Sequence, residues 1–427
     1  MKITSIKGFA DILPGEVETW QWVEAQVRQV FSAYNFAEIR IPIVEKTELF
    51  SRSIGETTDI VEKEMYTFED RDGRAGDNAE GARLTLRPEG TAGVVRAYVE
   101  AELYKIEPVR KLYYLGPMFR RERPQKGRMR QFHQIGAEAL GRGDPYIDVE
   151  ILLLLHDFFQ ALALAEPSLQ INSLGCSDCR PHYRDRLLAY LKERETALCG
   201  NCRRRIDRNP LRALDCKEPG CIAATQDAPS IVDGLCAVCR EHFETVQRLL
   251  IATHVNFTLN PRMVRGLDYY CRTTFEWTTK LLGSQSAVAA GGRYDGLVQQ
   301  LGGPPIPGVG FAMGVERLTM LLRLQERGDA VGPAVYFAWI GAKARDWAFP
   351  LVHRLRRQGV GVEIEAESRS LKSQMRRADK LKARTVVILG DDELGKGRAV
   401  LRDMTSKEQQ EIALDNLEAV LTARKAN

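Results

Sequence analysis

Four pairs of closely spaced cysteines lie in one stretch of this chain and constrain its fold more than any other feature. Eight of the nine cysteines fall within residues 172–254, and strand-like sequence resumes at Val255. We therefore expect residues 172–254 to form an insertion. The domain that it interrupts would then be discontinuous, formed by residues 1–171 and 255–327.

The N-terminal sequence indicates the environment of these thiols. Residues 1–16 contain no apolar signal segment, and polar side chains interrupt the apolar run at 151–165. We expect a cytoplasmic protein without membrane spans, in which thiols stay reduced. A 427-residue chain with 44% hydrophobic residues and a net charge of +4 is an ordinary globular protein of two or three domains.

The cysteine spacing is that of thiolate metal ligands. Up to two structural zinc sites of four thiolates each are possible, and four pairs can combine into two sites in three ways. Buried thiols without metal are the alternative, and the ninth cysteine, Cys271, is expected to be inert. The pairs are Cys176 with Cys179, Cys199 with Cys202, Cys216 with Cys221, and Cys236 with Cys239.

Two predicted strands, at 111–120 and 130–140, flank a basic loop. Between Arg120 and Arg130 there are five Arg and one Lys against one Glu. Such a loop on a rigid support suits a polyanion site, although a solvated hairpin tip is equally compatible with the charge.

Alternation along the second strand divides its side chains between two faces. Phe132, Gln134, Gly136 and Glu138 share one face, which can stack a base and bind a small polar ligand, and His133 points the other way. We therefore expect His133 to have a structural role.

Residues 333–427 alternate strand and helix, which predicts a small α/β domain after a linker at 328–333. Its helix at 370–382 carries an apolar stripe of Leu371, Met375, Ala378 and Leu381. Four basic side chains lie largely off this stripe and form either a solvated face or a phosphate-binding one. They are Lys372, Arg376, Arg377 and Lys380.

Several of these segments resemble class II aminoacyl-tRNA synthetases. EIRIPIVEKTELF with Pro42 resembles motif 1, FRRE at 119–122 resembles motif 2, and GVGFAMGVERL at 308–318 resembles motif 3. Three further blocks resemble the histidyl-tRNA synthetase family specifically: TLRPEGTAG at 85–93, RGLDYYCRTTFEW at 265–277 and AGGRYDGLVQQLGG at 290–303. The resemblance implies an α+β class II catalytic core with an antiparallel sheet, the Cys-rich insertion, and a C-terminal α/β anticodon-binding domain at 333–427.

The resemblance also implies an activity and partners. The chain would activate L-histidine with ATP and Mg²⁺ to histidyl-adenylate and transfer histidine to its tRNA, working as a homodimer. The alternative is the synthetase-like regulatory subunit of ATP phosphoribosyltransferase, which senses histidine without catalysis but is expected to lack the C-terminal domain. An RNA-binding module without chemistry would leave the polar pocket residues unexplained.

Adenylate formation brings two anions together, so fixed cations are the expected catalytic groups. By resemblance, Arg265 and Arg120 are catalytic and approach the α-phosphate. Glu138 and Tyr270 would bind the imidazole. The resemblance assigns ATP to Arg120, Glu122, Phe132, Arg265 and Arg317, and histidine to Glu89, Thr91, Arg120, Arg128, Gln134, Glu138, Arg265, Tyr269, Tyr270 and Tyr294.

Overall fold

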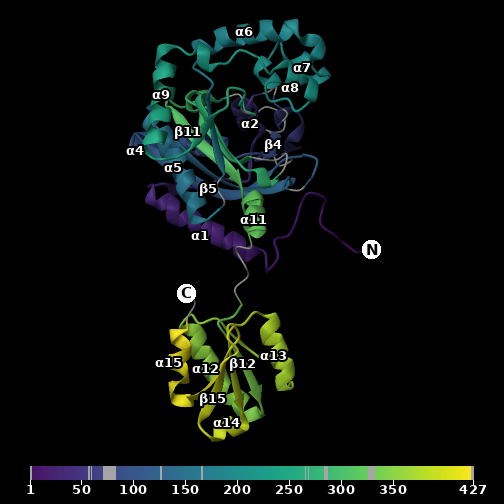
Figure 1. Cartoon of the computed structure of the whole chain (residues 1–427), viewed down its shortest axis with the longest axis vertical. Coiled ribbons are helices and arrows are strands. Elements are labelled where there is room, and N and C mark those ends of the chain that lie inside the picture. Colours follow the sequence, from purple (N-terminus) through teal and green to yellow (C-terminus); the bar gives the residue numbers. More distant parts are fainter. Residues whose placement is uncertain are drawn as a thin grey trace. The chain divides into compact units, whose positions relative to one another are not determined.

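The computed structural model describes residues 2–55, 58, 60–70, 83–125, 127–164, 167–264, 266–267, 269–282, 287–325 and 332–424. The chain forms two compact units, Met1–Gly328 and Asp329–Asn427 (Figure 1). None of the described helices is long and apolar enough to span a membrane.

The first unit is built on a sheet to which its described residues contribute eight strands, in the order β1-β5-β6-β11-β10-β9-β7-β8. Only the edge pairs β1–β5 and β7–β8 are parallel. The two strands expected around the basic loop are confirmed as β5 and β6, which pair from Arg110 opposite Leu140 to Phe119 opposite Gln131. The strands are β1 (Ala37–Glu38), β5 (Arg110–Phe119), β6 (Gln131–Leu140), β7 (Ser168–Ser173), β8 (Phe257–Leu259), β9 (Cys271–Thr278), β10 (Ala287–Arg293) and β11 (Gly308–Gly314).

Helices α1 (Val17–Ala33) and α5 (Pro145–Ala161) cover one face of this sheet. Apolar side chains recur along α1 at helical spacing, and Val27 and Phe31 are buried in one cluster with Ile135 of β6. Helix α5 begins with proline, and the Asp144 carboxylate accepts a hydrogen bond from the Tyr146 N–H at its first turn. Helix α11 (Val315–Leu324) follows β11 directly.

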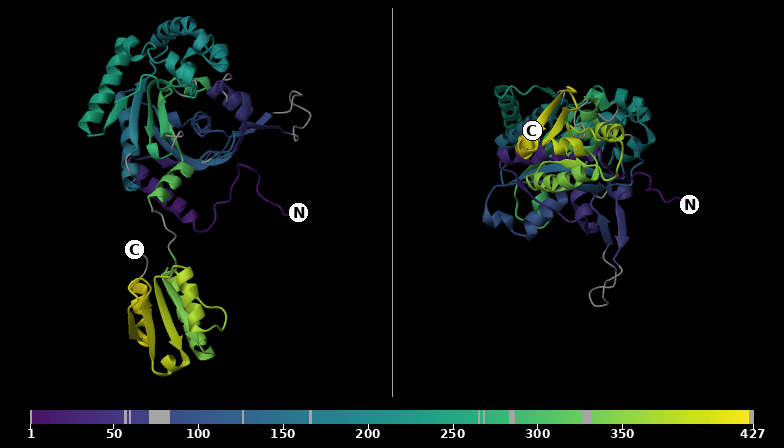
Figure 2. Two further views of the ribbon diagram at one scale, coloured as in Figure 1. Left: turned by 45° about the vertical axis from the view of Figure 1, so that its right-hand side comes forward. Right: turned by 90° about the horizontal axis from the view of Figure 1, so that it is seen from below.

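A three-stranded sheet, β2-β4-β3, lies beside the main sheet, and both views in Figure 2 show the β3–β4 hairpin projecting from the unit. The segment that contains Pro42 separates two strands, since β1 ends at Glu38 and β2 begins at Val44. The Arg87 guanidinium donates to the carbonyls of Ile41 (2.7 Å) and Pro117 (2.8 Å), which fixes this broken segment against β5. The elements here are β2 (Val44–Lys46), α2 (Thr47–Ile54), η1 (Ile60–Glu64), β3 (Tyr66–Glu69), β4 (Arg83–Leu86), α3 (Thr91–Glu100), α4 (Leu103–Ile106), η5 (Lys280–Leu282) and α10 (Leu297–Gln300).

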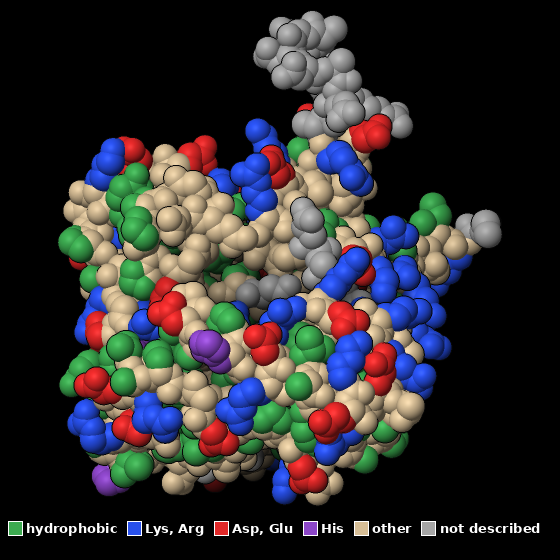
Figure 3. Space-filling model, turned by 90° about the horizontal axis from the view of Figure 1, so that it is seen from above, with side chains coloured by type: hydrophobic (Ala, Val, Ile, Leu, Met, Phe, Trp, Pro, Cys, Tyr) green, Lys and Arg blue, Asp and Glu red, His purple; other side chains and the backbone are tan. Residues whose placement is uncertain are grey.

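The Cys-rich stretch is helical, and residues 174–256, all described, contain no strand. Its helices lie together at one end of the unit in Figure 1, and α9 packs on α5. Leu187, Leu191 and Phe243 belong to the same buried cluster as the main sheet. Figure 3 views the molecule from above relative to Figure 1, and Lys and Arg side chains gather along the right-hand margin of this face. The elements are α6 (Cys179–Glu193), η2 (Glu195–Ala197), α7 (Gly200–Arg205), η3 (Pro210–Ala213), α8 (Pro219–Ala224), η4 (Val232–Gly234) and α9 (Ala237–Ala252).

The second unit has the predicted alternation of strands and helices, with described strands in the order β13-β12-β14-β15-β16. β13, β12 and β14 are parallel, whereas β15 and β16 form an antiparallel hairpin that the pattern did not predict. The elements are β12 (Val335–Ile340), α12 (Ala342–Arg357), β13 (Val362–Ile364), α13 (Leu371–Lys380), β14 (Thr385–Gly390), α14 (Asp391–Gly395), β15 (Arg398–Asp403), β16 (Gln409–Ala413) and α15 (Leu414–Ala423).

The apolar stripe expected on α13 is correct except at its end. Ala378 is buried, but Leu381 follows the last helical residue and is 37% exposed. Gln374 is buried instead, and its amide bonds both the N–H (2.9 Å) and the carbonyl (2.7 Å) of Trp339. A polar side chain is stable there because both of its hydrogen-bonding groups are satisfied.

Candidate active site

A cavity of about 300 Å³ opens on the face of the main sheet opposite α1 and α5. Strands β6, β9, β10 and β11 and the start of α3 contribute to its wall. Glu138 and Tyr294 lie directly behind the wall, and Arg265 is outside the described residues. The cavity brings together most of the predicted site residues: Glu89, Thr91, Arg120, Glu122, Arg128, Phe132, Gln134, Tyr269, Tyr270 and Arg317.

One end of the cavity is cationic. Arg120 lies 5.3 Å from the centre of the Phe132 ring, and its Nε donates to the Pro88 carbonyl at 2.8 Å. The carboxylate of Glu122 is 2.7 Å from Nε of Arg128 and 3.9 Å from Nη1 of Arg120. It therefore lies between two guanidinium groups and forms the closer ion pair with Arg128.

Arg317 enters the same end from α11, far away in the sequence. Burial lowers the pKa of its guanidinium, and the positive charges of Arg128 and Arg120 lower it further. A bound polyanion would relieve this repulsion. Three converging arginines therefore give this end the positive charge and the donors that suit a phosphate group.

The other end is closed by a buried carboxyl group. Glu138 accepts a hydrogen bond from the Thr91 hydroxyl at 2.6 Å and another from the Tyr294 hydroxyl. Burial raises the pKa of Glu138 to about 8, and the charge of Glu89 adds to the shift. A Cβ on Gly310 would lie 1.8 Å from the Glu138 carboxylate, so glycine is required where β11 passes it.

Glu89 holds the start of helix α3. Its carboxylate accepts the N–H groups of Thr91 (2.7 Å) and Ala92 (3.0 Å). Burial raises its pKa, which these hydrogen bonds oppose. A carboxylate at a helix N-terminus is also favoured by the helix dipole.

Three tyrosines pack together at this end. The ring centres of Tyr269 and Tyr270 are 4.6 Å apart, and Tyr294 meets Tyr269 edge to face at 5.7 Å. Burial raises the pKa of the Tyr269 hydroxyl well above its usual value, so it stays neutral. The pocket thus combines aromatic walls with polar groups that can bind a planar polar ring.

Sequence reasoning missed two acidic residues of the wall, Glu276 of β9 and Glu316 of α11. Both residues belong to the sequence blocks at 265–277 and 308–318 that resemble the family. For Glu276, the alternation of side chains along β9 could have indicated which face it occupies. The Glu316 carboxylate accepts the His133 N–H at 2.8 Å and lies 3.1 Å from its Nδ1. The His133 ring packs edge-on against Trp20 of α1, which confirms that it points away from the Phe132 face.

The cysteines form two groups, each with four sulfur atoms within 4.8 Å of one another. All are free thiols, as is Cys271, whose pKa burial raises to about 11. The structure thus selects one of the three possible combinations of pairs. Cluster 1 is Cys176, Cys179, Cys236 and Cys239, and cluster 2 is Cys199, Cys202, Cys216 and Cys221.

Comparison with known proteins agrees with this geometry. The family model described as histidyl-tRNA synthetase matches residues 8–318. The chain belongs to the histidyl-tRNA synthetase family. A model described as an anticodon binding domain matches residues 334–424.

Members of this family resemble the chain over nearly its whole length. The histidine–tRNA ligase of Trichlorobacter lovleyi is 60% identical, covering 97% of each chain, and that of Geobacter sulfurreducens is 59% identical, covering 96% of this chain and 97% of the relative. The crystal structure of apo histidyl-tRNA synthetase from S. aureus superposes with a TM-score of 0.80 at 33% identity, covering 99% of this chain and 100% of the other. The regulatory alternative is therefore not favoured.

Proposed function

We propose that this cavity activates L-histidine with ATP and then transfers histidine to the 3′ end of its tRNA, which makes the chain a histidine–tRNA ligase. The observation that carries this proposal is the convergence of Arg120, Arg128 and Arg317 at one end of a cavity. Its other end is lined by Thr91, which donates to the buried Glu138 carboxylate behind the wall. A phosphate site and a polar-ring site are thus joined in one space.

In the first step a carboxylate oxygen of histidine attacks the α-phosphorus of ATP. The new P–O bond forms as the bond to the β-phosphate bridging oxygen breaks, and pyrophosphate leaves. In the second step a terminal hydroxyl of tRNA attacks the acyl carbon, and AMP leaves. Both steps need charge stabilisation rather than a covalent protein nucleophile.

The arginines bind different phosphates of ATP. Arg120 bridges the α-phosphate and the histidine carboxylate, and Arg317 binds toward the γ-phosphate. Phe132 stacks on the adenine and Glu122 accepts from its amino group. Arg265, which lies outside the described residues, is the further catalytic arginine that the sequence resemblance assigns to the α-phosphate.

Histidine occupies the closed end. Glu138 and Tyr270 bind the imidazole, while Glu89, Thr91 and Gln134 hold the α-amino group. Arg128, Tyr269 and Tyr294 complete the pocket. Such a site rejects apolar side chains because they would leave its buried polar groups unpaired.

Two kinds of metal accompany this function. Mg²⁺ enters with ATP and neutralises the phosphate charge. Zinc in the two cysteine clusters is structural, because each cluster is closed by four thiols and lies outside the cavity.

The second unit binds the anticodon of the tRNA through the basic face of α13. Lys372, Arg376 and Lys380 are exposed there, whereas Arg377 is engaged with Glu363 and Glu365. Three exposed cations at intervals of four residues can follow a phosphate backbone.

A homodimer in the cytoplasm completes the proposal. Ile43 and Val44, beside the edge strand β1, are 43% and 40% exposed, so this segment has an apolar surface to bury against a second copy. Light scattering coupled to gel filtration would give twice the chain mass, and a single chain mass at micromolar concentration would contradict it.

Exchange of labelled pyrophosphate into ATP tests the activity. The purified chain should exchange with histidine alone among the standard amino acids, without tRNA. Histidine binding without exchange would support the regulatory alternative and overturn the proposal.

A further inference from the structure

The sulfur positions in both clusters match a tetrathiolate metal site. The Sγ–Sγ distances are 3.7 Å for Cys176–Cys179, 3.9 Å for Cys176–Cys236 and 3.9 Å for Cys199–Cys216. Four sulfurs each about 2.3 Å from one zinc ion at tetrahedral angles lie about 3.8 Å apart. The distances are far from a disulfide bond, and the ligand set suits zinc.

Cluster 1 closes a loop that is bonded to the histidine pocket. The backbone N–H of Arg272 donates to the Gly175 carbonyl (2.8 Å), and that of Leu174 to the Arg272 carbonyl (2.7 Å). Arg180, one residue after Cys179, donates its guanidinium to the carbonyl of Tyr270. The first turn of α6 therefore holds Tyr270 from behind the pocket.

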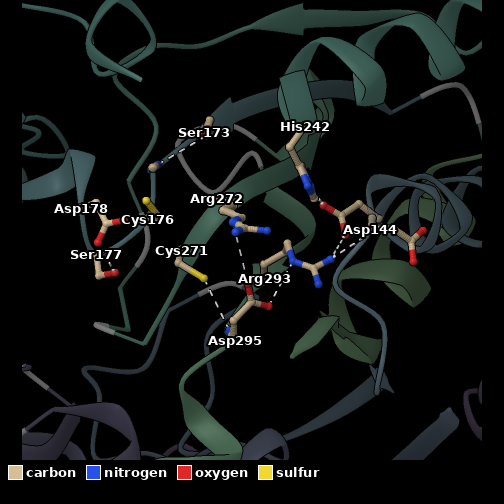
Figure 4. Close-up of polar contacts among 12 residues, drawn as sticks. Asp144, Ser173, Cys176, Ser177, Asp178, His242, Cys271, Arg272, Arg293 and Asp295 are labelled. Carbon is tan, nitrogen blue, oxygen red and sulfur yellow. Dashed lines mark hydrogen bonds and ion pairs between the residues drawn. The ribbon is translucent and has the colours of Figure 1, made fainter. Parts of the chain in front are cut away.

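A second connection runs from cluster 1 through α9. Cys239 and His242 are one turn apart on this helix, and His242 Nε2 is 2.7 Å from the buried Asp148 carboxylate. The other oxygen of Asp148 pairs with Arg293, whose Nε is 3.1 Å from Asp295. Figure 4 shows His242, Arg293 and Asp295 turned toward one another in this network. The next residue after Arg293 is Tyr294, which contacts Glu138.

Cluster 2 has its own connection to the chain just before Tyr270. It joins the starts of α7 and α8 around the short helix η3. Arg212 of η3 donates to the carbonyl of Gly266. The carbonyls of Gly266 and Tyr270 thus each accept a hydrogen bond from an arginine that is close in sequence to a cluster cysteine.

We propose that each cluster binds one zinc ion, and that the two ions fix Arg180, His242 and Arg212 so that the insertion positions the histidine pocket. These three are positioning residues, since they act through Tyr270, Arg293 and Gly266. The positioning half rests on the proposed function, whereas the metal half stands independently of it.

Metal analysis of the purified full chain tests the first half. Two zinc ions per chain are expected, with Cys239→Ser and Cys221→Ser each retaining one, and Cys271→Ser as the matched control retaining two. Cobalt substitution of the wild-type chain should give thiolate-to-metal absorption. Reduced, folded wild type with less than one metal per chain, or with iron in place of zinc, overturns the assignment.

Arg180→Gln tests the second half. Arg184→Gln is its control, because Arg184 lies on the same helix and donates to the carbonyls of Asp207 and Arg208 within the insertion. Arg180→Gln should keep two zinc ions and raise the dissociation constant of histidine about tenfold or more, with ATP binding little changed. Arg180→Lys should restore part of the affinity. Wild-type histidine affinity in Arg180→Gln overturns positioning, and absence of histidine binding by wild type refutes the proposed function while the zinc count still stands.

Discussion

The Thr91 hydroxyl donates a 2.6 Å hydrogen bond to the Glu138 carboxylate, so the start of helix α3 and strand β6 meet at the closed end of the cavity. Glu138 also receives the Tyr294 hydroxyl. The carboxyl group is buried and oriented by two donors, and one of them, Thr91, lines the cavity. This arrangement makes Glu138 the residue on which selection of histidine should depend most.

Glu138→Gln should raise the KM for histidine about ten- to hundredfold, because leaving a buried polar group of the ligand or the site without its partner costs about 1–3 kcal/mol. The KM for ATP should change little. Pyrophosphate exchange measures both. Glu100→Gln, which changes an exposed carboxylate on α3, serves as the control, and an unchanged KM for histidine in Glu138→Gln would contradict the assigned role.

Glu138 should also make stability depend on pH. Burial raises the pKa of this carboxyl from 4.5 to about 8, so the folded chain binds the proton more tightly than the unfolded chain. The resulting stabilisation is complete below about pH 4.5 and is lost as the pH rises toward 8. Urea unfolding should show that the difference in free energy of unfolding, wild type minus Glu138→Gln, decreases by up to about 1.4 kcal/mol per pH unit across this range. A difference that grew with pH would have the wrong sign.

Arg317→Met should separate activity from stability. Removing this half-buried cation relieves its repulsion with Arg128 and Arg120, so Tm should stay within a few degrees of wild type. Exchange should fall about a hundredfold, because a preorganised cation at the phosphates is lost. Arg323→Met, on the same helix but paired at the surface with Glu16, should retain activity. Equal losses in both variants would argue against a phosphate role for Arg317.

Arg265→Ala should raise the activation free energy of adenylate formation by roughly 3 kcal/mol or more. This is the scale of losing one donor at a developing charge. Single-turnover formation of adenylate measures the step directly. Arg262→Ala is the matched control, since that guanidinium contacts Thr225 in the insertion. Near-normal exchange by Arg265→Ala would remove it from the catalytic set.

Removing positive charge from the exposed face of α13 should weaken the binding of tRNA without changing amino-acid activation. Arg376→Ala and Lys380→Ala should each raise the KM for tRNA and lower the salt dependence of binding by about one unit of slope. Exchange without tRNA should be unchanged. Lys396→Ala, an exposed lysine after α14, is the control, and a tRNA affinity that is equal in all variants would place the contact elsewhere.

Much of the fold followed from local patterns. Strands β5 and β6, helix α13 and the alternation of the second unit were expected, because side-chain periods of 2 and 3.6 come from backbone geometry and are visible in any short window. The antiparallel β15–β16 hairpin and the buried Gln374 were not. The first depends on which strand edge is free to pair, and the second on a backbone partner, Trp339, supplied by another strand.

The candidate site divides in the same way. The sequence by itself determined that Phe132, Gln134 and Glu138 share a face of one strand, and that eight cysteines come in close pairs, because both are properties of neighbouring residues. Only the tertiary structure decided that Arg317 meets Arg120 and Arg128, that Glu276 and Glu316 line the cavity, and that Cys176 and Cys179 face Cys236 and Cys239. These long-range contacts require the strand order β6-β11-β10-β9 and the packing of α9 on α5. Such long-range order arises from burial of the whole core, which no local stretch of sequence encodes.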